Sequence, residues 1–421
     1  MQKNLVSDGR EPFPFKMFLI YVLFYAGQAM YNVYLNLFLN QNGFSNTQLG
    51  LLSSVSTVVL VLVQPLWGVL SDKSKSKNQI VGMLLLISAI VGLAFYASKT
   101  ALWLSLCVLL FNVFFNPAVT LQDNYTLEML EGGRWDFGQL RLGGTLGYAA
   151  CAALIGYVVG GSIDIINAFT DAICAVVLGF VVETDYEHIF WMMGIFFIIT
   201  GVLYFTLPRV SGHREKKQKV KYSLLLKDRR LVCMFVFNIV YTLGTAFFYQ
   251  FYSIHYSNEL GASSVMVGLL STFGALSEIP FFWFAGRLQK RFGTKALMLF
   301  AGASAAARWL LLSMLTNTSV ILVVNMLSGC GFVGFSYSLI RYINDNVPKS
   351  MRATAQSLNG ILGTFFSRII FTPINGILAD HFSISTVLLG NGLLMVAAVL
   401  LFAFTFSKAE AYQKAHPVLE E

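Results

Sequence analysis

Apolar runs of about 20 residues recur along the whole chain, and they constrain its fold more than any other feature. Folded as an α-helix, each run is long enough to cross a hydrocarbon core of about 30 Å. The short alternating segments that a transmembrane β-barrel requires are not seen. The pattern therefore predicts an all-α membrane protein. We predict twelve transmembrane helices, at residues 14–39, 48–70, 79–97, 102–122, 140–160, 189–207, 231–254, 265–286, 296–315, 320–343, 353–379 and 385–406.

The composition supports lipid as the solvent of this chain. Of its 421 residues, 56% are hydrophobic and only 12% are charged, whereas a soluble globular chain has roughly 25% charged residues. The sequence contains no phosphate-binding loop, zinc-ligand spacing or nucleophile elbow. Its five cysteines have no paired spacing. We therefore expect no enzyme activity, no cofactor and no metal.

The net charge of +8 is explained by where the basic residues lie. In the predicted topology they gather in alternate loops, including the central connection 208–230, and the opposite loops hold only Lys99. Cytoplasmic loops of membrane proteins carry such an excess of positive charge. We therefore predict a monomeric, multi-pass protein of the plasma membrane, embedded in the lipid bilayer, with both termini in the cytoplasm and no nucleic-acid partner.

The basic central connection also separates six predicted helices from six. We expect an N-terminal six-helix bundle at residues 1–207, a cytoplasmic linker at 208–230, a C-terminal six-helix bundle at 231–406 and a cytoplasmic tail at 407–421. Residues 161–188 contain no Lys or Arg but several Asp and Glu residues. Since a thirteenth span would place the basic connection outside, we interpret them as an external insertion.

Few ionisable residues fall within the predicted spans. Asp123 ends the fourth helix, Arg141 begins the fifth, Glu278 lies in the middle of the eighth, and Arg308 and Arg368 lie in the ninth and eleventh. Each such charge costs about 2.5–3.5 kcal/mol unless it has a partner or a watery cavity. For Asp123, Glu278 and Arg308 we favour function over static ion pairing. Near a helix end, Arg141 could also reach toward the interface.

Amide side chains follow one face of the first predicted helix. Gln28, Asn32 and Asn36 are four residues apart, so they share a face. We expect this face to line a cavity, with Asn116 of the fourth helix contributing another amide. The alternative is hydrogen bonding between helices, which is worth only about 0.6 kcal/mol on average in membranes.

Two stretches resemble the major facilitator superfamily. VQPLWGVLSDKSKSKN, from Val63 to Asn78, resembles the loop between helices two and three of that family. The resemblance implies a conformational loop in which Gly68 allows a close approach to a neighbouring helix, Asp72 faces a helix N-terminus and Lys73 retains a positive charge. It also implies the major facilitator fold, with two pseudo-symmetric six-helix bundles.

The second stretch, DFGQLRLGGTLGYA from Asp136 to Ala149, resembles the start of helix five in lactose permease and the related oligosaccharide and proton symporters. In register, the resemblance implies sugar binding by Asp123, Arg141 and Tyr148. A carboxylate accepts hydroxyl protons, a guanidinium donates from a planar fork, and a ring stacks on sugar carbons.

The C-terminal half departs from that pattern. The positions that match the family's proton-coupling His and Glu on helix ten are Ser328 and Gly331. Arg308 matches the family's arginine on helix nine, and Glu278 lies in SEIPFFWFAGRL, which resembles the phenylpropionate permease branch. We therefore predict that Glu278 and Arg308 couple protons, with Glu278 facing a central cavity and in reach of Arg308 directly or through one water.

These features together predict proton-coupled symport of a small polar solute, most simply a sugar or oligosaccharide, by alternating access. Three alternatives stay open: an exporter or uniporter, a permease for a nucleoside or an aromatic acid, and a sensor that does not transport.

Overall fold

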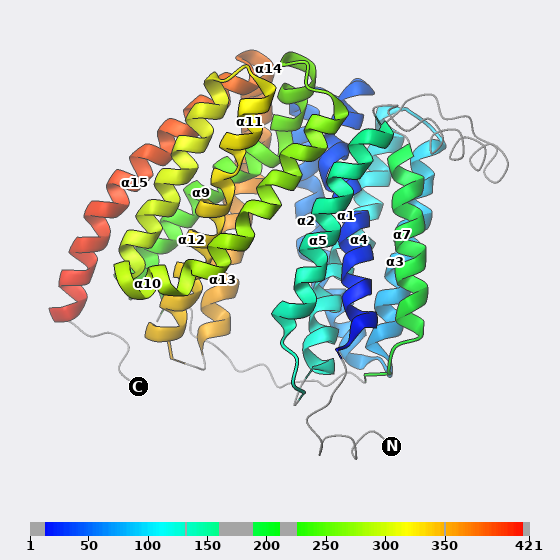
Figure 1. Ribbon diagram of the computed structural model, residues 1–421, viewed down its shortest axis with the longest axis horizontal. Helices are drawn as coiled ribbons and strands as arrows, with labels where there is room; N and C mark the ends of the chain where they lie inside the picture. Colours follow the sequence, from blue (N-terminus) through cyan, green and yellow to red (C-terminus); the bar gives the residue numbers. More distant parts are fainter. Residues whose placement is uncertain (1–12, 131–132, 160–187, 211–224, 349–350, 416–421) are drawn as a thin grey trace. The chain divides into compact units, whose positions relative to one another are not determined.

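The computed structural model describes residues 13–130, 133–159, 188–210, 225–348 and 351–415, and this part of the chain is helical throughout apart from short turns (Figure 1). It divides into two compact units. Unit 1 comprises the described residues before position 216 except 43–55, and unit 2 comprises 43–55 together with the described residues after 215. Apart from residue 188, the insertion predicted at 161–188 lies outside the described residues.

The helices of each unit follow one another along the chain. Unit 1 contains α1 (Phe15–Gln41), α3 (Lys77–Leu93), η1 (Ala94–Tyr96), α4 (Ala101–Met129), α5 (Phe137–Val159) and α7 (His188–Phe205). Helix α2 (Asn46–Lys73) begins in unit 2 and continues in unit 1. Unit 2 contains α9 (Arg229–Ile254), η4 (His255–Glu259), α10 (Ser264–Met314), α11 (Thr318–Asn325), α12 (Leu327–Asn346), α13 (Arg352–Thr364), η6 (Phe365–Phe371), α14 (Thr372–His381) and α15 (Ile384–Ala415).

Every predicted span overlaps a helix, but the count of twelve is not established. Within the described ranges, nine helices are long and apolar enough to cross a membrane. One of them, α10, covers two predicted spans and is interrupted at Gly293, whose φ of 80° and ψ of 167° suit only glycine. Helix α4 continues to Met129, so Asp123 lies inside it rather than at its end.

Two helices of unit 2 continue past the bounds that the sequence predicts for them. Helix α9 begins at Arg229, inside the predicted linker, and α15 continues to Ala415, inside the predicted tail. The guanidinium carbon of Arg229 lies 3.6 Å from the centroid of the Tyr412 ring, which ties the two helices together. The polar residues after position 406 therefore extend a packed helix.

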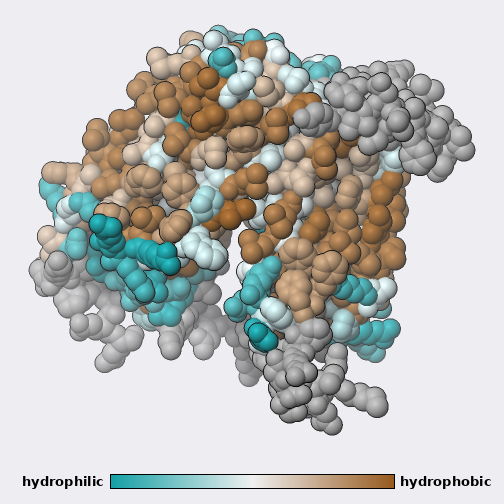
Figure 2. All heavy atoms as spheres, in the orientation of Figure 1, coloured by the Kyte–Doolittle hydropathy of each residue, from teal (hydrophilic) through white to brown (hydrophobic). Residues whose placement is uncertain are grey.

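The outer surface of the helices is apolar. On the face that Figure 2 shows, hydrophobic residues follow the lengths of the helices and hydrophilic residues gather toward helix ends. Leu102, Trp283, Met314 and Leu400 are among many large apolar side chains that are exposed. In water such a surface would aggregate, whereas in lipid it faces its own solvent, and each helix satisfies its backbone internally.

Two of the helical prolines, Pro117 and Pro373, each free a backbone carbonyl for which α2 supplies a donor. Pro117 has no N–H to give the carbonyl of Val113, which accepts a hydrogen bond from Trp67 Nε1 at 3.1 Å. Pro373 likewise frees the carbonyl of Ile369, which accepts from the Ser54 hydroxyl at 2.9 Å. The second carbonyl lies in η6, a wide π-helical turn, so α2 stabilises an irregular segment of unit 2.

We expect Ser54→Ala to lower the thermal stability of the protein, because the Ile369 carbonyl would lose its donor. An unsatisfied buried group costs about 1–3 kcal/mol. Thermal melting in detergent measures the change. Ser105→Ala is the matched control, since that exposed hydroxyl bonds only to Ala101 of its own helix. Equal melting temperatures for both variants would contradict this account of the turn.

Candidate functional site

Asp123 lies in α4, and one of its two carboxylate oxygens accepts a hydrogen bond from another described residue. The Tyr21 hydroxyl, from α1, donates to Asp123 Oδ1 at 2.8 Å. Among the described residues Oδ2 has no hydrogen-bond partner, and the side chain is only partly buried. Because Tyr21 itself is fully buried, it fixes the carboxylate in place. The open oxygen can accept a further proton donor.

Arg141 lies near the start of α5 and stacks on an aromatic ring of α1. Its guanidinium carbon is 3.9 Å from the centroid of the Tyr25 ring. Gly144 provides the room, because a Cβ there would lie 2.8 Å from Arg141 Nη1 and 2.6 Å from the Tyr25 ring. Tyr25 in turn stacks on Tyr21, with ring centroids 6.0 Å apart and planes at 10°.

Helices α1 and α5 approach closely through glycines, and this contact positions Arg141. A Cβ at Gly147 would lie 2.1 Å from the Val22 carbonyl oxygen, and one at Gly143 would lie 2.9 Å from that of Phe18. Small residues allow such contacts between membrane helices. The sequence signal was Gly143 and Gly147 at GxxxG spacing, which our sequence analysis overlooked along with Tyr21.

Asp123 and Arg141 are therefore linked through two stacked tyrosines, and their charges also act on each other over a longer distance. No ion pair within 4.0 Å joins them in the part of the chain that the structure describes. Both side chains are partly exposed. The arrangement leaves an acceptor and a planar set of donors available to a ligand within unit 1.

The other residues predicted to bind solute also lie in unit 1. Tyr148 is partly buried on α5, two turns beyond Arg141. Gln28 is partly buried and Asn32 is exposed, so the amide face of α1 is less buried than its flanks. Asn116 Nδ2 donates to Asn112 Oδ1 at 2.7 Å, and Asn112 Nδ2 lies 3.2 Å from the Tyr31 hydroxyl.

In unit 2, Arg308 has a direct partner other than the predicted one. This buried guanidinium donates from Nε and Nη2 to Asn325 Oδ1, at 3.0 and 2.7 Å, and its carbon lies 3.9 Å from the centroid of the Phe248 ring. Glu278 is partly buried on the same long helix, α10.

The loop motif after α2 differs from expectation at its glycine. A Cβ at Gly68 would meet no described atom within 4 Å, so the close approach expected there is not found. Asp72 Oδ1 lies 3.8 Å from Nζ of Lys77, the first residue of α3. The same buried ammonium pairs with Glu128 of α4. Lys73 is exposed at the end of α2.

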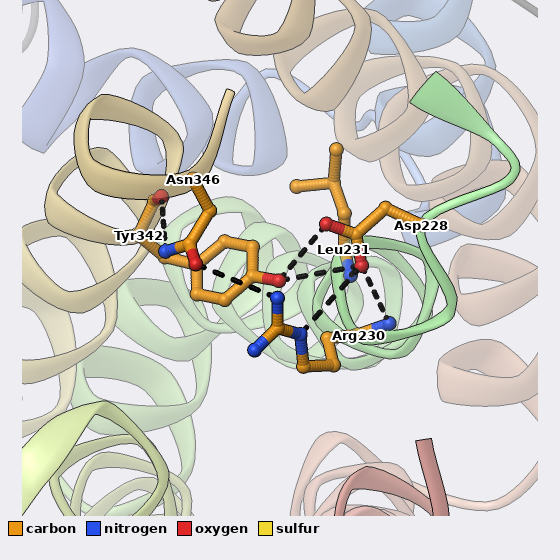
Figure 3. Close-up of polar contacts among 5 residues, drawn as sticks. All are labelled: Asp228, Arg230, Leu231, Tyr342 and Asn346. Carbon is orange, nitrogen blue, oxygen red and sulfur yellow. Dashed lines mark hydrogen bonds and ion pairs between the residues drawn. The ribbon is translucent and has the colours of Figure 1, made fainter. Parts of the chain in front are cut away.

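A second Tyr–Asp pair lies in unit 2, and its aspartate, Asp228, falls in the part of the chain predicted to be linker (Figure 3). Asp228 is fully buried and caps α9, accepting from the backbone N–H groups of Arg230 and Leu231 at 2.9 and 3.1 Å. The Tyr342 hydroxyl of α12 donates to Asp228 Oδ2 at 2.9 Å. Both oxygens of Asp228 are thus engaged, whereas Oδ2 of Asp123 has no hydrogen-bond partner among the described residues.

Comparison with known proteins identifies the family. The model of the MFS_1 like family matches residues 15–389. The maltose permease of Geobacillus stearothermophilus is 26% identical over 393 residues, 92% of each chain. YwbF of Bacillus subtilis, named as an uncharacterized transporter, is 23% identical over 373 residues, which is 88% of this chain and 87% of YwbF.

The fold agrees with a solved structure as well. A crystal structure of the nucleoside transporter NupG has a TM-score of 0.75 and 16% identity, and the match covers 93% of this chain and 98% of that one. The resemblance to the major facilitator superfamily is thereby confirmed, and the chain, a multi-pass membrane transporter, belongs to the MFS_1 like family.

Proposed function

We propose that this protein carries a sugar or oligosaccharide together with protons by alternating access. The observation that carries the proposal is the pair formed by Asp123 and Arg141 in unit 1, each contacting a tyrosine of α1, with no ion pair within 4.0 Å between them among the described residues. A polyol offers hydroxyl protons to the open carboxylate oxygen and hydroxyl oxygens to the guanidinium fork. Tyr148 would supply a ring face for the sugar carbons.

The relatives give independent support for this class of solute. The maltose permease aligns over nearly its full length. The likeness to the nucleoside transporter favours a second candidate, since the ribose of a nucleoside also presents hydroxyl groups. The two candidates differ in the base, which a saccharide lacks. A solute panel therefore separates them.

The test is uptake of radiolabelled solutes by proteoliposomes, with and without a pH gradient. The proposal expects one saccharide to accumulate above its outside concentration only when the outside is more acidic. Accumulation of a nucleoside or an aromatic acid instead would transfer the function to that alternative. Uptake of no solute, with or without the gradient, would favour a sensor.

We further propose that the protein is a monomer of the plasma membrane with both termini in the cytoplasm. The excess of Lys and Arg in alternate loops supports this orientation. The proposal makes residues such as Lys75 accessible only from the cytoplasm. Lys75→Cys in intact cells should therefore resist labelling by an impermeant reagent added outside.

For proton coupling we propose Glu278, with Arg308 stabilising its ionised form in part of the cycle. Glu278 lies near the middle of the first section of α10, far from either end of that section. Burial favours the protonated carboxyl group, and a nearby guanidinium favours the carboxylate. A carboxyl group whose surroundings change between conformations can therefore bind and release a proton.

Glu278→Gln should abolish accumulation driven by a pH gradient and preserve exchange of solute down its own gradient. The neutral amide keeps the size of the side chain but cannot release a proton. Uptake and counterflow in proteoliposomes measure the two activities separately. Glu259→Gln is the matched control, because Glu259 pairs with His255 beyond the end of α9 and should leave both activities intact. Accumulation by Glu278→Gln at the wild-type level would remove Glu278 from coupling.

A further inference from the structure

Arg368 is a charge in the middle of a membrane span to which the proposed transport cycle assigns no role. It lies in η6, near the centre of the 28-residue span Thr354–His381. At about 1.5 Å per residue, each end of the span is roughly 20 Å away along the helix axis. No side chain covers that distance, so Arg368 cannot place its guanidinium at either interface.

No described residue holds the guanidinium of Arg368. Its side chain is exposed, and among the described residues it has no hydrogen bond, ion pair or ring contact. No described carboxylate acts on it electrostatically either. Arg308 shows the contrast, since it is buried between Asn325 and Phe248. A charge at this depth is costly without a partner, and Arg368 therefore indicates a partner from outside the chain.

The backbone around Arg368 is built to hold this position. The wide turn of η6 follows from Pro373, and three hydroxyls satisfy it: Ser54 donates to Ile369, Thr372 to Ser367 and Ser367 to Gly363. Wide π-helical turns of this kind occur frequently at functional sites. The turn is thus a fixed element of unit 2 and presents Arg368 from a defined backbone.

The charges of unit 2 favour an anion at Arg368. Asp380, on α14 of the same span, is engaged by the backbone N–H groups of Asn46 and Thr47, at 2.9 and 2.8 Å. Asp345 pairs with Arg341 near the end of α12. Among the described mid-span residues of unit 2, one carboxylate, Glu278, therefore remains beside two arginines, Arg308 and Arg368. At mid-span, the described charged residues of unit 2 therefore carry an excess of positive charge.

We propose that Arg368 is an anion-binding position that takes the carboxylate or phosphate group of an acidic solute. The planar fork of a guanidinium matches two oxygens of either group and binds them bidentately. The proposal rests on the transport function above and narrows its solute class to acidic saccharides, such as uronates or sugar phosphates. Neutral sugars then bind more weakly than their acidic counterparts.

The experiment measures equilibrium binding of matched probes to purified protein. The probes are glucose, glucuronate and glucose 6-phosphate, with 3-phenylpropionate and 3-phenylpropanol as a pair without sugar hydroxyls. In the wild type we expect one acid to bind at least tenfold more tightly than its neutral counterpart. Arg368→Gln should remove that advantage and leave the affinity for the neutral counterpart within about twofold. The preferred acid distinguishes a carboxylate from a phosphate.

The variants make the result decisive. Arg287→Gln is the matched control, because Arg287 is an exposed arginine of α10 outside the site and should keep the preference for the acid. Arg368→Lys keeps the positive charge but not the planar fork, so it should retain part of the preference for the acid. This variant also tests the proposal if Arg368→Gln fails to fold. If the preference for the acid depends on Arg368 only with 3-phenylpropionate and 3-phenylpropanol, the assignment to saccharides is refuted and the anion site is supported. Acids that bind no better than their neutral counterparts, or an unchanged preference in Arg368→Gln and Arg368→Lys, would overturn it.

Discussion

Asp123→Asn and Arg141→Lys should each weaken binding of the transported solute by at least about 100-fold. Asparagine replaces a pure acceptor by a group that also donates, and lysine replaces a planar fork by a single ammonium. A hydrogen bond to a charged group contributes about 1.5–3 kcal/mol, so losing one or two of them reaches this magnitude. Equilibrium binding to the purified variants measures the effect.

Folding controls separate binding from stability. Both side chains are partly exposed, so the variants should melt close to the wild-type temperature. Asp136→Asn and Arg134→Lys are matched substitutions just before α5, outside the pair that we assign to binding, and should bind solute normally. Unchanged solute affinity in both Asp123→Asn and Arg141→Lys would remove these residues from the site.

Asp228→Ala should produce the largest loss of stability among the residues described above. The substitution removes the cap of α9, the acceptor of the Tyr342 hydroxyl and the carboxylate that lies 3.9 Å from Arg230 Nε (Figure 3). Breaking a buried charged pair costs about 3–5 kcal/mol. The yield of folded protein and its melting temperature in detergent should both fall sharply.

Two further variants test the cause of that loss. Tyr342→Phe removes one donor and should cost less, about 1–3 kcal/mol. Asp345→Ala removes an exposed carboxylate that pairs with Arg341 on the same helix, and it should cost about 0.5 kcal/mol or less. If Asp228→Ala and the Asp345→Ala control melt at the same temperature, the contacts of Asp228 do not stabilise unit 2.

Hydropathy located the helices well because lipid leaves the backbone few alternatives. A chain in the bilayer must satisfy its N–H and C=O groups within each span, so apolar length alone indicates a helix. The helix ends were harder to predict. Helix α15 continues to Ala415 through polar residues, and its end depends on contacts such as Arg229 with Tyr412. Proline marks a freed carbonyl in the sequence, but only the fold shows that Ser54 donates to Ile369.

The charged residues of the candidate site could be predicted from the sequence, but the residues that contact them could not. Asp123 and Arg141 stand out because charges are rare in apolar spans. That Tyr21 and Tyr25 hold them depends on the rotation of α1 against α4 and α5, which residue spacing does not fix. The same limit explains Arg308, because residue spacing does not show that Asn325 is its partner. At Gly68 the motif suggested a close helix contact, but the described structure has open space there.

The central claim is that solute and proton move together through a protein whose solute site includes Asp123 and Arg141. The most direct measurement is the pH of a weakly buffered proteoliposome suspension when the transported solute is added without any ion gradient. The account predicts a rise in the outside pH that requires the solute, that a protonophore abolishes, and that Asp123→Asn and Arg141→Lys both lack. Solute entry at the wild-type rate with no change in the outside pH would contradict it.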